Sequence, residues 1–158
     1  MRRILALLAA LAFALPASAA DEPEAVFAKY HRAAVAGNLD EMLRYTTDSH
    51  RAEMSAMSPE QRAASFKLIN TLMPAKYAVR AKSVYPESGI ARLYIAGEAR
   101  ATIDSKPGML YGVVRLVVQR GEWKVGNVEW SNQDPGFPPN LALLTCDPTL
   151  CTPRTTRA

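Results

Sequence analysis

Two polar residues near the end of the last periodic segment are the best candidates for acid–base chemistry. Asn127 and Glu129 lie two positions apart, so in a β-strand their side chains point to the same face. On an enclosed apolar face, burial would raise the pKa of the Glu129 carboxyl and let it act as a general base, while Asn127 would donate a hydrogen bond to a developing oxyanion. The alternative is that Glu129 reaches solvent or pairs with an arginine.

The two histidines give weaker signals. His31 lies between Tyr30 and Arg32, where the sequence predicts a surface position. His50 and Glu53 are three residues apart and can share one face of a helix, but two ligands do not complete a zinc site, which takes three or four. We therefore predict no metal and no cofactor. Motifs of serine hydrolases, nucleotide-binding loops and zinc proteases do not occur in the sequence.

Two groups of aromatic and polar residues are candidates for binding. The first group could line a ligand cavity, although tyrosines at these spacings are also typical of packing in a core or at a rim: Tyr30, Tyr45, Tyr77, Tyr85, Asn127 and Glu129. The second group has the composition of a protein interface, although such aromatics also pair across strands without a partner: Tyr94, Tyr111, Arg115 and Trp130.

The elements that must position these residues are helices followed by strands. Helical spacing and start signals predict helices from Pro23 to Gly37, from Leu39 to Tyr45 and from Ser58 to Met73, with a weaker helical segment between Asp48 and Met57. From residue 76 the apolar period changes to two, and turn residues recur at regular intervals. The predicted strands are 76–85, 90–104, 109–119 and 122–131. This order predicts an α+β fold, with helices packed on one face of a curved four-stranded antiparallel sheet.

The turn at Arg120-Gly121 suggests a register for the last two strands. A two-residue turn places Val118 opposite Trp123, Leu116 opposite Val125 and Val114 opposite Asn127, with Tyr111 opposite Trp130 on the other face. We predict that Leu116, Val118, Trp123 and Val125 are core, together with the inward set Leu93, Ile95, Ala101 and Ile103. Asn127 and Glu129 then face inward, and Trp130 faces outward.

The first nineteen residues predict export. Arg2 and Arg3 precede an apolar run from 4 to 15, and Ala17-Ser18-Ala19 is a small-residue cleavage site, so 1–19 is interpreted as a signal peptide. The predicted location is the periplasm or the exterior, with no stable membrane anchor after cleavage. The formal charge of +4, which includes both arginines, forms no basic stripe, so nucleic acid is not expected as a partner.

The predicted domain covers 20–132, and a proline-rich tail covers 133–158. Cys146 and Cys151 lie in that tail, five positions apart. In an oxidising compartment a local disulfide between them is expected, which would pin the tail rather than hold the domain. Free or intermolecular thiols are the alternative.

Two segments resemble the NTF2-like, cystatin-like α+β superfamily: Ala33-Ala34-Val35-Ala36-Gly37-Asn38-Leu39-Asp40 and Gly121-Glu122-Trp123-Lys124-Val125. The resemblance extends from about Glu24 to Asn132. It implies a curved sheet that wraps a long helix into a cone, whose open end holds a ligand or active site in some members. Ketosteroid isomerases, scytalone dehydratases and polyketide cyclases in the superfamily use an Asp or His base, and their motifs are not reproduced in this chain.

The function expected from these observations is non-catalytic binding of a protein partner or a small apolar molecule. The resemblance also implies that a homodimer through the outer sheet face is possible. An isomerase or dehydratase with a carboxylate base in the cone is the second hypothesis. A periplasmic immunity or inhibitor protein is the third.

Overall fold

The computed structural model describes residues 21–135, with the exception of 100, 102 and 105. The predicted signal peptide lies outside the described residues. So do Cys146 and Cys151, and with them most of the predicted tail. The helices and strands of the described chain all fall between Pro23 and Ser131.

The architecture is α+β, as predicted, with four α-helices before a four-stranded antiparallel sheet in the order β1-β2-β3-β4. The helices are α1 (Pro23–Val35), α2 (Leu39–Arg44), α3 (Asp48–Ala56) and α4 (Pro59–Leu72). The strands are β1 (Ala78–Tyr85), β2 (Ile90–Ala99), β3 (Gly108–Gln119) and β4 (Glu122–Ser131), with a short 3-10 helix, η1 (Pro86–Ser88), between the first two.

Local sequence explains where the helices begin. The Asn38, Thr47 and Ser58 side chains accept hydrogen bonds from the first turns of α2, α3 and α4, respectively. At α4 the predicted capping box is present, because Gln61 also bonds back to the Ser58 backbone. Gly37, with φ of 73°, follows the end of α1. These signals fix the helix boundaries close to their predicted positions.

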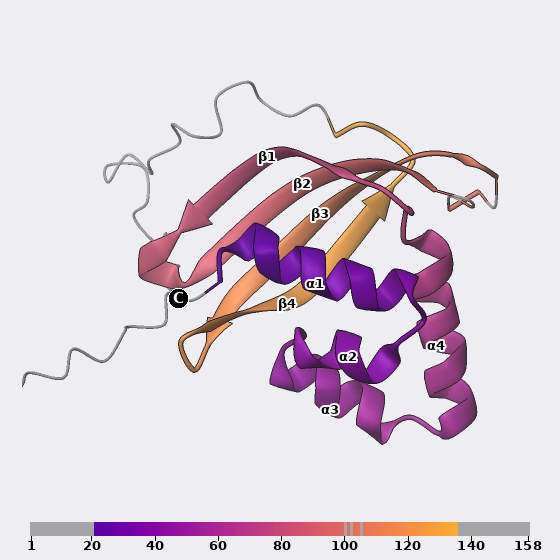
Figure 1. The fold of residues 1–158 in the computed structure, drawn as a ribbon, viewed down its shortest axis with the longest axis horizontal. Helices are drawn as coiled ribbons and strands as arrows, with labels where there is room; N and C mark the ends of the chain where they lie inside the picture. Colours follow the sequence, from indigo (N-terminus) through magenta and orange to yellow (C-terminus); the bar gives the residue numbers. More distant parts are fainter. Residues whose placement is uncertain (1–20, 100, 102, 105, 136–158) are drawn as a thin grey trace, which may run out of the picture.

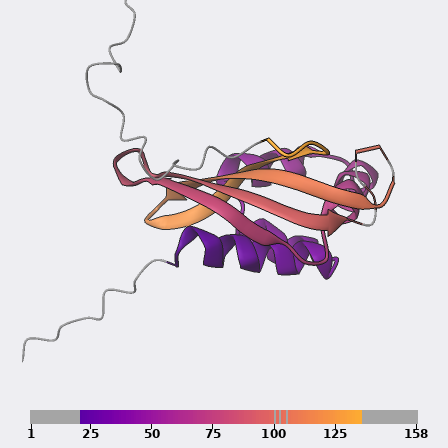
Figure 2. The same cartoon turned by 90° about the horizontal axis from the view of Figure 1, so that it is seen from above.

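The core lies between α1 and one face of the sheet, which we call the inner face. Figure 2 shows the sheet nearly on edge with α1 along one side of it. Phe27 of α1, Leu93 and Ile95 of β2, and Leu116 of β3 are completely buried there. Val125 is also buried and Trp123 is half-buried against the same cluster, so these predicted core residues are confirmed.

Two predicted core positions are wrong. β2 ends at Ala99, where it pairs with Gly108, so Ile103 lies beyond the ladder and its side chain is 55% exposed. Val118 does pair with Trp123, as the turn predicted, but it lies at the hairpin end of the sheet and is 42% exposed. The period of two thus carried the predicted strand past its actual end at Ala99, and at Val118 it identified the strand although the covering elements do not extend to that end of the sheet.

His31 is buried, which contradicts its predicted surface position. Its Nε2 lies 2.7 Å from the Pro74 carbonyl oxygen, and its ring packs against Tyr77 with centroids 4.6 Å apart. Because a carbonyl only accepts, Nε2 carries the proton in this contact. The ring thus joins α1 to the segment between α4 and β1, and burial lowers the pKa of His31 despite the opposing effect of the Pro74 hydrogen bond.

This lowered pKa predicts a loss of stability in mild acid. The unfolded chain binds a proton near pH 6.5, whereas the folded protein resists protonation until lower pH, so stability should fall as pH decreases below that value. Denaturant midpoints measured from pH 7.5 to 5 should show this decrease for the parent and a smaller one for His31→Gln. His50→Gln is the control. An equal decrease in the parent and the His31 variant would contradict the assignment.

Candidate ligand-binding site

A cavity of about 230 Å³ lies between α4 and β4. Its apolar wall is formed by residues of α4 and its C-terminal cap and by three residues of β4: Leu68, Ile69, Leu72, Met73, Val125, Val128 and Trp130. Polar groups come from three other elements: Tyr30 of α1, Thr46 before α3 and His50 of α3. The cavity is therefore apolar on one side and offers a few polar groups on the other, which is the usual composition of a small-molecule site.

A β-bulge at Gly126 decides which residues of β4 reach this cavity. Val125 pairs with Leu116, as predicted, but Asn127 pairs with Arg115 rather than with Val114. The extra residue turns every later side chain to the opposite face. Val128 and Trp130 consequently pack against the inner core, whereas Asn127 and Glu129 are exposed. The predicted register is correct up to Val125 and wrong beyond it.

Trp130 reaches inward because its partner on β3 is a glycine. Gly112 is the cross-strand partner of Trp130, and a Cβ at Gly112 would lie 2.8 Å from the indole ring and 2.9 Å from Ile95. The absent side chain makes room for the ring on the inner face. Trp130 was predicted to face outward with the interface group, and this orientation is wrong.

Tyr30 is, with Thr46, one of two buried polar residues at the cavity. Its side chain extends from α1, the residue is only 4% exposed, and burial raises its pKa to about 12. In the part of the chain that the structure describes, its hydroxyl makes no hydrogen bond to another residue. The phenol therefore stays protonated at neutral pH and has a donor available toward the cavity.

The connection between α2 and α3 holds the polar side of the cavity against β4. The Thr47 N–H donates to the Val125 carbonyl at 3.1 Å, and the Val125 N–H donates to the Tyr45 carbonyl at 2.7 Å. Thr47 also caps α3 by accepting a hydrogen bond from the His50 N–H. The His50 Nδ1 lies 3.8 Å from the nearer Glu53 carboxylate oxygen, so these two residues do share a helical face, as predicted. His50 is thereby placed at the cavity wall.

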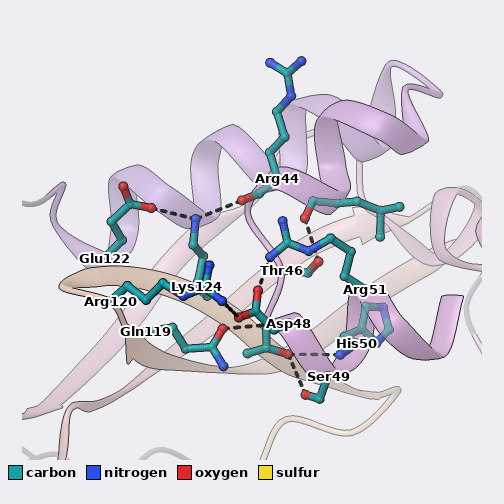
Figure 3. Close-up of polar contacts among 12 residues, drawn as sticks. Arg44, Thr46, Asp48, Ser49, His50, Arg51, Gln119, Arg120, Glu122 and Lys124 are labelled. Carbon is teal, nitrogen blue, oxygen red and sulfur yellow. Dashed lines mark hydrogen bonds and ion pairs between the residues drawn. The ribbon is translucent and has the colours of Figure 1, made fainter. Parts of the chain in front are cut away.

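An ion pair and a hydrogen bond attach α3 to the β3–β4 hairpin (Figure 3). Asp48 pairs with Arg120 at 2.8 Å and with Arg51, and its N–H donates to the Gln119 side chain at 3.0 Å. Arg120 has a positive φ of 53° and is followed by Gly121 at 80°, the dihedrals of a type I′ turn. The turn thus aims the Arg120 guanidinium at α3.

The α4 helix, which covers the cavity, is only partly buried against its neighbours. No residue of α4 is fully buried, and Leu68 is 60% exposed. The Asn70 side chain donates to the Ala34 carbonyl at 2.6 Å and thereby attaches α4 to the end of α1. Ile69 and Leu72 are half-buried toward the cavity. A helix with this little burial is expected to be among the less stable parts of the fold.

The predicted tyrosine group does not line one cavity. Tyr45 donates to the Glu41 carboxylate at 2.8 Å and borders a different depression beside α1 and α2. Tyr77 packs against Phe27 and His31, and Tyr85 is exposed at the end of β1. Only Tyr30 of this group reaches the cavity between α4 and β4.

The predicted acid–base pair is not enclosed. Asn127 borders the cavity, but its side chain is exposed and its Nδ2 donates to Glu129 at 3.2 Å. Glu129 faces outward with an exposed side chain. The enclosed apolar face that the predicted general base would require is therefore missing.

The outer interface group is partly assembled. Tyr94 and Tyr111 are half-buried on the face opposite α1, and Arg115 is exposed beside them.

Among the described residues, no three His, Cys, Asp or Glu side chains gather as a metal site would require.

A comparison with protein-family models and with curated proteins finds no match to this chain. None of the helices in the described range is long and apolar enough to cross a membrane.

Proposed function

We propose that this protein is an exported NTF2-like domain that binds a small apolar molecule carrying one hydrogen-bond acceptor in the cavity between α4 and β4. The observation that carries the proposal is the Tyr30 hydroxyl, which belongs to a buried residue at an apolar cavity and has no hydrogen-bonding residue in the described chain. A ligand oxygen bound there would gain a hydrogen bond worth about 0.5–1.5 kcal/mol. The order of helices and strands supports the superfamily, and the first nineteen residues support export.

The cavity suits a compact ligand. At about 230 Å³ it is smaller than the cavities that hold drug-sized molecules, which occupy roughly 300–1,000 Å³. Ile69, Leu72 and Trp130 offer apolar contacts to a ring system, and Tyr30 would orient an oxygen at one end. The matched probes 1-tetralone and tetralin differ by one carbonyl group and test these two contributions separately.

Tyr30→Phe is expected to weaken binding of 1-tetralone by up to about tenfold, because a hydrogen bond contributes about 0.5–1.5 kcal/mol. Binding of tetralin should not change, since it has no acceptor. Calorimetric titration of both probes measures the difference. Tyr45→Phe, which loses a hydroxyl outside the cavity, is the control. An equal effect of Tyr30→Phe on both probes would remove the orienting role of Tyr30.

Acid–base catalysis is the second candidate, because His50 lines the same cavity as Tyr30. With the Tyr30 hydroxyl on a ketone oxygen, His50 could remove a proton from the adjacent carbon. Exchange of the 1-tetralone α-protons in deuterated buffer, followed by proton NMR, distinguishes the two functions. Binding alone predicts no exchange above the buffer rate. Accelerated exchange that His50→Gln abolishes would favour the enzyme instead.

A further inference from the structure

Two arginines face each other on the outer face of the sheet, which we define as the face opposite α1. Arg92 of β2 and Arg115 of β3 are cross-strand partners, and both residues are exposed. Among the described residues, neither guanidinium forms an ion pair. Like charges directly opposite each other destabilise a sheet. The chain therefore carries a local electrostatic cost at this point, and a negatively charged partner would relieve it.

Apolar pairs flank the two arginines on both sides along the strands. Tyr94 pairs with Val113 in one direction and Ile90 pairs with Val117 in the other, and all four side chains are half-buried. Arginine and tyrosine beside apolar surface are enriched in protein interfaces. The outer face thus combines a positive centre with apolar contacts on either side of it.

The acidic residues of this face do not neutralise the arginine pair. Glu129 lies opposite Val113 on β4, and its carboxylate accepts a hydrogen bond from Asn127 at 3.2 Å. Glu98 lies opposite Met109, near the far end of β2. The negative charge that would complement Arg92 and Arg115 must therefore come from another molecule or from outside the described residues.

A second copy of the chain does not supply that charge at the centre. A symmetric dimer with its axis near Arg92 and Arg115 would bring four guanidinium groups together, and like charges juxtaposed in an interface oppose association. Two arginines also fall short of the basic stripe that a nucleic acid requires. These considerations favour an acidic protein segment over both alternatives.

We infer that the outer face of the sheet is a docking surface for an acidic segment of another protein, whose carboxylates bind Arg92 and Arg115 while its apolar side chains contact the flanking pairs. Guanidinium groups bind carboxylates through two parallel hydrogen bonds, which gives such a contact both strength and orientation. This surface lies on the outer face of the sheet, whereas the cavity between α4 and β4 lies on the inner face. The docking proposal and the ligand-binding proposal can therefore be tested separately.

Selection of peptides from a randomised twelve-residue phage library, with the immobilised full chain as target, tests the inference. We expect enrichment of peptides that combine Asp or Glu with apolar residues. Synthetic versions of the selected peptides should bind at least tenfold more weakly to Arg92→Gln and to Arg115→Gln, and more weakly at high salt. Arg32→Gln, which removes an exposed arginine from α1, is the control and should bind normally.

A thermal melt of each variant completes the test. Both arginine variants should melt at or slightly above the parent temperature, because removing either charge relieves the repulsion. A loss of peptide binding with an unchanged or higher melting temperature supports the docking surface. Selected peptides without acidic enrichment, or with equal affinity for the arginine variants, would overturn it. So would a stable dimer of the parent that Arg115→Glu dissociates.

Discussion

Replacing Phe27 with alanine is expected to lower the free energy of unfolding by about 3–5 kcal/mol. Phe27 is completely buried, and its ring lies 5.1 Å from that of Tyr77, 5.9 Å from that of Tyr30 and 6.2 Å from that of His31. The substitution leaves a cavity at the contact between α1, the sheet and the segment after α4. A domain of this size has about 5–15 kcal/mol in total, so much of the chain would be unfolded at 37 °C.

Urea denaturation followed by far-ultraviolet circular dichroism measures this effect. Tyr85→Ala is the matched control, because Tyr85 is an exposed aromatic residue at the end of β1 and should change stability by no more than about 0.5 kcal/mol. Equal midpoints for the two variants would show that α1 does not pack on the sheet as described.

Filling the cavity is expected to abolish ligand binding without unfolding the protein. Val128→Trp projects an indole from the inner face of β4 into a space of about 230 Å³. The affinity for both 1-tetralone and tetralin should fall at least about tenfold, equivalent to about 1.4 kcal/mol, because the ring occupies the ligand's place. Calorimetry with both probes measures the loss, and a melting curve checks that the variant is folded.

Val113→Trp is the matched control for this substitution. Val113 is also a half-buried sheet valine, but it lies on the outer face, one strand away. It should leave the affinity for both probes unchanged. If Val128→Trp unfolds the chain, Leu72→Trp introduces the same ring from the α4 side of the cavity. Retained affinity in a folded Val128 or Leu72 variant would place the ligand elsewhere.

The fold class could be predicted from the sequence because its signals are local. The capping box at Ser58 and Gln61, the caps at Asn38 and Thr47, and the change of period after Lys76 each depend on neighbouring residues alone. The Arg120-Gly121 turn likewise set the register as far as Val125. These features reproduced the order of elements and most of the inner face.

The candidate site could not be predicted because it depends on one bulge. Asn127 and Glu129 share a face, as their spacing required, but the extra residue at Gly126 makes that the outer face. A glycine inside a strand is a known signal of a bulge, so Gly126 was the residue that could have indicated the inversion. With the bulge taken into account, Val128 and Trp130 would have been placed inward.

Other features of the fold and of the site depend on contacts between distant segments. His31 is buried because Pro74 and Tyr77 pack over it, more than forty residues later in the chain. Tyr30 and His50 reach one cavity because the α2–α3 connection pairs with β4 at Val125. No spacing along the sequence encodes such contacts, so the sequence did not place His50 beside Tyr30.

The most direct test of the central claim is the detection of intermolecular nuclear Overhauser effects between 1-tetralone and the protein. If the ligand binds in the cavity between α4 and β4, its protons should show contacts to the Trp130 indole and to the methyl groups of Ile69 and Leu72. Tyr85 and Val117, which lie outside the cavity, should show none. Contacts confined to the outer face, or saturable binding with no contact to Trp130, would contradict the account.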